Sequence, residues 1–137
     1  MAADQAIQRR VMQKALTSAG LSGSDIGFVH AHATSTPVGD LVEAGAITTV
    51  VGNDVPVTST KSMTGHLLGG AGALGAIVTI QALRTGSLPG TLNLENLDSN
   101  INLNAIRTTT GCAGTKAAIT NAFGFGGHST TLVITAP

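Results

Sequence analysis

The spacing of hydrophobic positions changes along the chain from a helical to a strand-like pattern. Between Ile7 and Ala19 the apolar residues recur on one helical face, and Gly20 followed by Leu21 predicts that this helix ends in a Schellman motif. Residues 26–31 are apolar on both faces apart from His30, which is typical of a strand in a sheet that helices cover on both sides. The first part of the chain therefore predicts a helix followed by a buried strand.

The rest of the chain continues this alternation of helices and strands. Thr36 can cap a helix and Pro37 is tolerated in a first turn, so the pair predicts a helix start. Residues 88–104 are rich in asparagine and predict a long loop with short extended pieces. We expect the further helices over residues 37–51 and 65–84, and the further strands over residues 55–60, 117–122 and 130–135. This order predicts one α/β unit with a mixed sheet.

Charge and composition exclude several classes of function. Seven basic and seven acidic residues give a net charge of zero, so nothing indicates a nucleic-acid footprint. The apolar run over residues 67–83 is interrupted by glycines, which favours a buried helix over a membrane span. The single cysteine, Cys112, excludes an internal disulfide and suits a reducing compartment, and the first ten residues form no signal peptide. We therefore expect a cytoplasmic protein.

His32 follows a predicted strand directly and precedes a predicted helix, in the segment His-Ala-Thr-Ser-Thr-Pro. An incidental histidine in a capped turn is one interpretation. The other is functional, because ligands of α/β sheets bind beyond the carboxyl ends of the strands. His32, Thr34 and Thr36 would lie at such an end.

His66 stands at a second junction of strand and helix, in the segment Lys-Ser-Met-Thr-Gly-His that begins at Lys61. We expect it in the first turn of the long helix, where the helix dipole disfavours a positive imidazolium. A neutral imidazole there could donate a hydrogen bond to a carbonyl oxygen. The alternative is a histidine that only caps the helix.

Two further features could belong to a site. The segment from Phe123 to His128 holds three glycines, which let a backbone approach a ligand closely, although an ordinary hairpin turn is the alternative. Glu43 is an acidic residue in an apolar stretch, and a solvated helix face is the default for it. If it is buried, we expect Lys61 as its partner, because buried charges are rarely unpaired.

Other candidates rank lower. We expect His30 to be a packed, hydrogen-bonded histidine, and Cys112 to be a small structural or surface thiol with nothing nearby in sequence to lower its pKa. The spacing of the histidines fits no compact zinc pattern.

Taken together and in order, these segments resemble the condensing enzymes of fatty-acid and polyketide synthesis. The resemblance runs from about Ile7 to the C-terminus, and its motifs lie in residues 29–47, 59–76, 92–96 and 121–127. It implies that residues 1–137 are the C-terminal domain of a β-ketoacyl-acyl-carrier-protein synthase. The implied fold is a thiolase-like half-domain, a mixed five-stranded sheet with helices packed on its faces.

In that family an acyl chain is loaded onto a cysteine, and the carbanion from a decarboxylated malonyl thioester attacks it. The resemblance implies that His32 and His66 hydrogen-bond the malonyl thioester oxygen, that Lys61 tunes them and that Glu43 is the acidic partner of Lys61. It also implies a gating role for Phe125. The residues implied to contact the phosphopantetheine arm are Thr34, Thr36, Gly126 and Gly127.

The resemblance also implies which partners the protein has. It needs no resident cofactor, because 4'-phosphopantetheine arrives on the acyl carrier protein that bears the malonyl or acyl thioester. The other partner is the N-terminal half of the synthase, and the full-length enzyme is expected to be a homodimer. We expect neither nucleic acid nor membrane as a partner.

The chain departs from the family pattern in three places. Ala33 stands where many relatives have glycine, a change expected to matter little, and Ser129 follows His128 where asparagine is common. The nucleophilic cysteine of the family belongs to the N-terminal half, and Cys112 lies in the wrong segment to replace it. We therefore expect the chain alone to be inactive in condensation.

Four alternatives remain from the sequence. They are a non-catalytic partner like a chain-length factor, a polyketide ketosynthase domain, a member of the thiolase branch and a plain α/β binding module. Retention of His32, His66 and Lys61 argues against the first, and the absence of a cysteine near Gly126 argues against the third.

Overall fold

The computed structural model describes residues 3–137, and a five-stranded mixed sheet organises them. The sheet order is β4-β2-β1-β6-β7; β1, β2, β4 and β6 run parallel, and β7 is antiparallel to β6. A separate antiparallel pair is formed by β3 and β5. The strands are β1 (Ile26–His30), β2 (Pro56–Thr58), β3 (Ser87–Leu88), β4 (Asn104–Ala105), β5 (Thr110–Gly111), β6 (Ala117–Phe123) and β7 (Ser129–Thr135). The expected mixed five-stranded sheet is confirmed.

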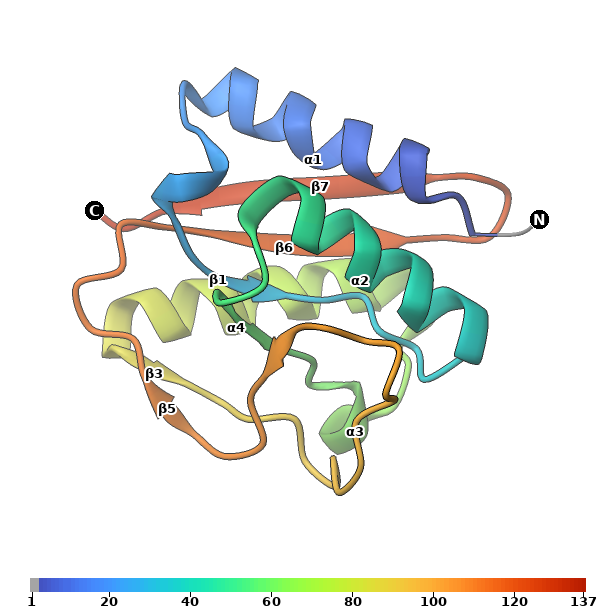
Figure 1. Ribbon diagram of the computed structural model, residues 1–137. Coiled ribbons are helices and arrows are strands. Elements are labelled where there is room, and N and C mark those ends of the chain that lie inside the picture. The colour runs from blue at the N-terminus through green and yellow to red at the C-terminus, as the bar shows by residue number, and fades with distance from the viewer. Residues whose placement is uncertain (1–2) are drawn as a thin grey trace.

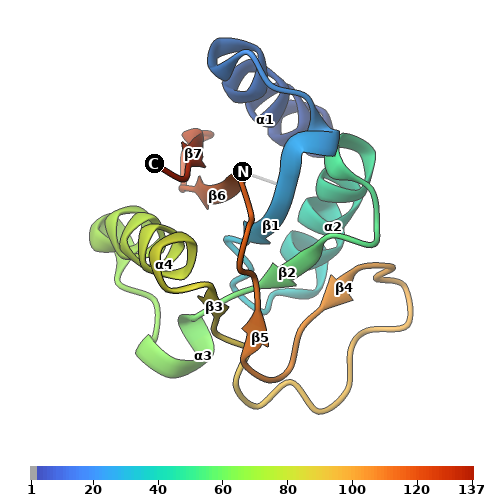
Figure 2. The same ribbon diagram turned by 90° about the vertical axis from the view of Figure 1, so that its left-hand side faces the viewer.

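Helices cover both faces of the sheet, with α1 and α2 on one side and α4 on the other (Figures 1 and 2). Neighbouring residues of β1 show this division. Val29 packs with Met12 of α1 and Ile47 of α2, whereas Phe28 packs with Ala82 of α4. The helices are α1 (Gln5–Ala19), α2 (Pro37–Val51), α3 (Lys61–Thr64) and α4 (Ala71–Thr85), with 3₁₀ turns η1 (Gly23–Asp25) and η2 (Leu68–Gly70). Within residues 3–137, none of these helices has the length and apolar character to cross a membrane.

Helix α1 ends as predicted, but its first turns bury a different residue from the one expected. Gly20 adopts a left-handed conformation, and the N–H of Leu21 donates to the Leu16 carbonyl at 3.0 Å, which is the Schellman ending. However, Ile7 is 45% exposed, and Gln8 is buried in its place at 5% exposed. The predicted apolar face is therefore wrong at Ile7, because this end of the helix lies at the edge of the core.

The long glycine-rich helix is shorter than predicted. It begins at Ala71 rather than Gly65, because Gly65 has a φ of 75° and Leu68 a φ of 51°, values that a right-handed helix does not contain. Residues 61–64 form α3, and residues 68–70 form η2. His66 consequently lies between these two short elements, outside the first turn of α4.

One glycine of α4 explains how closely this helix approaches the sheet. A Cβ atom on Gly75 would lie 2.9 Å from Thr120 Oγ1 of β6 and 3.1 Å from His30 Nδ1 of β1. Any larger residue would push α4 away from the sheet.

Candidate active site

The strands place the predicted site residues at one edge of the sheet. Because β1 pairs in parallel with both β2 and β6, the carboxyl ends of these three strands meet there. His32 follows β1, Lys61 follows β2, and Phe123 is the last residue of β6. The expectation that His32 lies at the carboxyl end of a strand is confirmed.

The structure brings the two predicted histidines together. The ring centroids of His32 and His66 are 5.6 Å apart at an interplanar angle of 83°, and the Phe123 ring lies 5.8 Å from His32 on centroids. The N–H of Leu68 donates to His66 Nδ1 at 3.0 Å, which requires a lone pair on Nδ1 and places the ring proton on Nε2. Because His66 lies outside α4, this hydrogen bond, and not the predicted helix dipole, determines which ring nitrogen carries the proton. Rings at this separation can direct two N–H groups at one oxygen atom.

The surroundings of His32 keep its ring neutral. Burial is the largest cause that lowers the pKa of His32 from 6.5 to about 4, and the positive charge of Lys61 and the neighbouring His66 contribute in the same direction. Lys61 is itself half-buried, and burial lowers its pKa while Glu43 and Asp40 oppose that change. The charge of Lys61 therefore helps to keep His32 neutral.

Glu43 lies beneath the His32 loop, and its hydrogen-bond partners are in that loop and on Asn121. The side chain is 3% exposed and accepts hydrogen bonds from the backbone N–H of His32 and of Ala33, both at 2.8 Å, and from Asn121 Nδ2 at 3.2 Å. Burial raises the pKa of Glu43, and these N–H groups and the more distant charge of Lys61 oppose the rise. Lys61, the expected partner, acts on Glu43 through its charge, whereas the His32 loop and Asn121 supply the hydrogen bonds.

The loop after His32 is held in an unfavourable backbone conformation. Ala33 has a φ of 30° and Ser35 a φ of 65°, in the region that glycine prefers. Two carboxylates hold the loop there, since Glu43 binds the N–H of Ala33 and Asp40 Oδ1 accepts from the N–H of Ser35 at 3.1 Å. The expectation that alanine at position 33 matters little stays a prediction, and the φ of Ala33 gives a way to test it.

This conformation gives a stability prediction for Ala33→Gly. Left-handed backbone costs a non-glycine residue about 1–2 kcal/mol, whereas glycine loses about 0.5–1 kcal/mol of backbone entropy. We expect Ala33→Gly to leave the free energy of unfolding unchanged or to raise it by up to about 1 kcal/mol, as measured by urea denaturation. Ala73→Gly, at an exposed position in α4, is the control and should lose about 0.5–1 kcal/mol. Equal losses of unfolding free energy in the two variants would show that the backbone of Ala33 is not strained.

Thr34 and Thr36 lie next to each other in the same loop. Their hydroxyl oxygens are 3.4 Å apart, and Thr36 is exposed. Thr36 is the N-cap residue of α2, but its side chain makes no capping hydrogen bond. The predicted cap is therefore wrong in its chemistry, because the Thr36 hydroxyl faces Thr34 instead.

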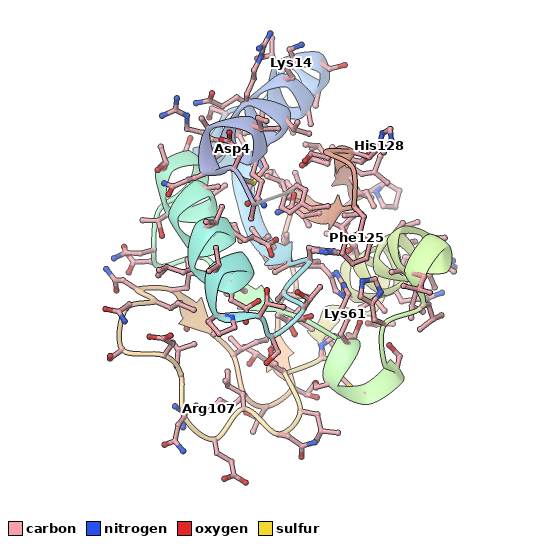
Figure 3. The ribbon with its side chains drawn as sticks, turned by 90° about the vertical axis from the view of Figure 1, so that its right-hand side faces the viewer. Asp4, Lys14, Lys61, Arg107, Phe125 and His128 are labelled. Carbon is pink, nitrogen blue, oxygen red and sulfur yellow. The ribbon has the colours of Figure 1, made fainter. Side chains whose placement is uncertain are left out.

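The glycine-rich segment forms the turn between β6 and β7. The N–H of Gly124 donates to the His128 carbonyl at 2.6 Å, and Gly126 and Gly127 have φ values of 83° and 82°. Phe125 is 93% exposed on this turn (Figure 3). Its gating role stays a prediction.

Cys112 lies away from the histidine pair. Its Sγ donates to the Ala82 carbonyl at 3.3 Å, toward the end of α4, whereas His66 precedes the start of α4 at Ala71. The helix alone spans about 16 Å between Ala71 and Ala82. Burial also raises the pKa of the thiol, which disfavours the reactive thiolate. These features are consistent with the small structural or surface thiol that was predicted.

His30 is the packed histidine that was predicted, and it gives a second testable consequence. It is buried, and its Nε2 lies 2.9 Å from Thr60 Oγ1. Burial, reinforced by the Lys61 charge, lowers its pKa from 6.5 to about 4. No group of three or more potential metal ligands occurs within residues 3–137.

The pKa of His30 predicts a loss of stability in mild acid. As pH falls from 6.5 to 4, the unfolded chain takes up a proton at this position while the folded chain does not, so folding weakens by about 3 kcal/mol. Chemical denaturation at several pH values measures this loss. His30→Gln is the comparison, because contributions from His32 and Glu43 are common to both proteins. A pH dependence unchanged by His30→Gln would contradict the prediction.

Sequence reasoning assigned no role to three residues of the site. Phe123 packs on His32, Asn121 binds Glu43, and Asp40 holds the loop at Ser35. Asn121 could have been noticed as a polar residue within the apolar strand pattern of residues 117–123.

Comparison with known proteins identifies the family of the chain. A family model described as "Beta-ketoacyl synthase, C-terminal domain" matches residues 1–95. The chain is 44% identical over 125 residues to 3-oxoacyl-acyl-carrier-protein synthase II, chloroplastic, of Arabidopsis thaliana, covering 89% of this chain and 23% of that protein. It is 47% identical over 117 residues to 3-oxoacyl-acyl-carrier-protein synthase 2 of Mycobacterium leprae, covering 85% and 28%. The chain thus spans less than a third of these relatives.

Solved structures agree with the sequences. A beta-ketoacyl synthase from Burkholderia phymatum superposes with a TM-score of 0.96 at 35% identity, covering 100% of this chain and 34% of that one. The ishigamide ketosynthase/chain length factor superposes with a TM-score of 0.94 at 30% identity, covering 99% of this chain and 34% of that one. A structure of a type II PKS acyl-carrier protein in complex with its ketosynthase superposes with a TM-score of 0.89 at 29% identity, covering 95% of this chain and 33% of that one. By fold and by the family match over more than half of its residues, the chain belongs to the β-ketoacyl synthase C-terminal domain family.

Proposed function

We propose that this chain supplies the histidine pair of a β-ketoacyl-acyl-carrier-protein synthase, which condenses malonyl-acyl-carrier protein with an acyl thioester in fatty-acid synthesis. The observation that carries the proposal is the His32–His66 pair, 5.6 Å apart at the carboxyl edge of the sheet. The relatives, whose names state synthase activity, support it.

The chemistry fits neutral donors. In decarboxylation, the bond between the malonyl α-carbon and its carboxylate breaks, carbon dioxide leaves, and the electron pair moves into an enolate whose oxygen carries the negative charge. N–H groups of His32 and His66 would stabilise that oxygen, as preorganised donors do in a site that excludes water. The α-carbon then attacks the acyl thioester carbonyl, the carbon–sulfur bond breaks, and the thiolate leaves.

The cysteine that carries the acyl group would come from outside the described residues, since Cys112 is remote from the histidines. We accordingly propose that the chain alone does not condense. Thr34, Thr36, Gly126 and Gly127 would line the path of the phosphopantetheine arm, and Phe125 would gate it. The related ketosynthase in complex with an acyl-carrier protein supports that partner.

A chain-length-factor-like role is the second candidate, favoured by the similarity to the ishigamide ketosynthase/chain length factor. Such a non-catalytic partner needs no decarboxylation machinery. The observed arrangement of His32, His66 and Lys61 supports the catalytic role.

A chimera tests the proposal. This chain replaces the matching part of the Arabidopsis synthase, and β-ketoacyl product formed from acyl- and malonyl-acyl-carrier protein is detected by mass. We expect product from the chimera and none from the chain alone. Product from the chain alone would contradict the assignment of Cys112. A folded chimera that loads an acyl group but forms no product would overturn the catalytic role in favour of the chain-length-factor role.

A further inference from the structure

A line of buried hydrogen bonds runs from β7 to the loop that carries His32. The hydroxyl of Thr131 donates to Asn121 Oδ1 at 2.8 Å, and Asn121 Nδ2 donates to Glu43 Oε1 at 3.2 Å. Glu43 then accepts from the backbone N–H of His32 and of Ala33, both at 2.8 Å. Thr131, Asn121 and Glu43 are all buried, so no competing solvent replaces these partners.

The chemistry of the groups fixes the direction of this line. A side-chain amide has a donor end and an acceptor end, and its partners decide which way it points. Thr131 donates to the oxygen of Asn121, so the NH₂ group faces the Glu43 carboxylate and, at 3.6 Å, the Met12 sulfur. The reversed amide would place its oxygen against a carboxylate that only accepts. The Glu43 carboxylate therefore selects this orientation of the amide, and the Thr131 hydroxyl holds the amide in place by donating to its oxygen.

This line of hydrogen bonds ends at the backbone N–H groups of His32 and Ala33, which belong to the site. Glu43 binds the N–H of His32, whose ring faces His66, and the N–H of Ala33, whose φ of 30° needs restraint. A shift of the carboxylate would move both N–H groups and with them the His32 ring.

We propose that Asn121 and Thr131 are positioning residues of the histidine site. Together they hold the Glu43 carboxylate in the place that fixes the His32 backbone, and so they set the separation of the His32 and His66 rings. The catalytic consequence rests on the proposed function, whereas the positioning can be observed without any reaction.

The test on this chain is nuclear magnetic resonance of the His32 and Ala33 amides. Thr131→Val keeps the β-branched shape and removes the hydroxyl, and Thr130→Val is the matched control at an exposed neighbouring position of β7. We expect Thr131→Val to shift both amide signals and Thr130→Val to leave them in place. Thr131→Ser retains a hydroxyl and should restore the original signals. Unshifted amides in Thr131→Val, or shifted amides in Thr131→Ser, would overturn the proposal.

The second readout is catalysis in the chimera. Misplaced catalytic groups lose up to about a hundredfold in rate, so we expect Thr131→Val to lower kcat about tenfold or more while KM for malonyl-acyl-carrier protein changes little. A change confined to KM would overturn the positioning role in catalysis. If the unmodified chimera loads acyl groups but does not condense while the amides respond as expected, the proposed function fails and the positioning stands.

Discussion

Replacing Glu43 with alanine is expected to lower the free energy of unfolding by about 3–5 kcal/mol, a large part of the 5–15 kcal/mol that keeps a typical domain folded. The change removes the acceptor of three N–H groups, on His32, Ala33 and Asn121, in a place without solvent. Each buried donor left without a partner costs about 1–3 kcal/mol. Urea unfolding followed by circular dichroism measures the loss.

The size of this effect does not mean that the carboxylate itself is strongly stabilising. Burial raises the pKa of Glu43, so placing the charge there costs free energy that the N–H groups offset. The stability lost in Glu43→Ala comes from the buried N–H donors that are left without an acceptor. Glu43→Gln should therefore remain well below the wild-type stability, since its NH₂ group would face an N–H donor.

Glu95→Ala provides the control for Glu43→Ala. Glu95 is exposed, so its removal should change the free energy of unfolding by no more than about 0.5 kcal/mol. A loss below about 1 kcal/mol in Glu43→Ala would show that the His32 loop finds other acceptors, and the positioning of His32 by Glu43 would have to be abandoned.

Local sequence signals predicted most of the fold. The helix from Pro37 to Val51 has its bounds as expected, because proline and glycine mark its ends. The strands around His30 and Ala118 were recognisable because both of their faces are apolar. The start of α4 was not predicted correctly, because an apolar run does not reveal that Leu68 adopts a φ of 51°.

The partners of buried charges were harder to predict than the elements. Lys61 and Glu43 are the obvious pair in the sequence, yet Glu43 binds backbone N–H groups and Asn121. Backbone donors carry no sequence signal, and Asn121 reaches Glu43 only because β6 lies beside β1 in the sheet. The pairing of His32 with His66 was implied by the family resemblance, and the structure accounts for it because both residues follow neighbouring parallel strands.

The histidine pair itself gives the largest expected effect on activity. In the chimera we expect His66→Ala to lower kcat by about 10²–10³-fold, the usual consequence of removing one preorganised donor from a developing oxyanion. His66 is exposed, and its ring accepts from the Leu68 N–H at 3.0 Å, so its loss should leave the fold intact. The loss of rate would therefore report chemistry and not unfolding, and circular dichroism checks this directly.

His128→Ala is the matched control, because it removes an exposed histidine on the turn between β6 and β7. We expect it to retain the rate of the unmodified chimera. Malonyl decarboxylation, measured by release of carbon dioxide, should fall in His66→Ala in parallel with condensation, since the enolate forms in that step. If decarboxylation persists at its original rate while condensation is lost, His66 acts after the enolate has formed, and its assignment as an oxyanion donor in decarboxylation is wrong.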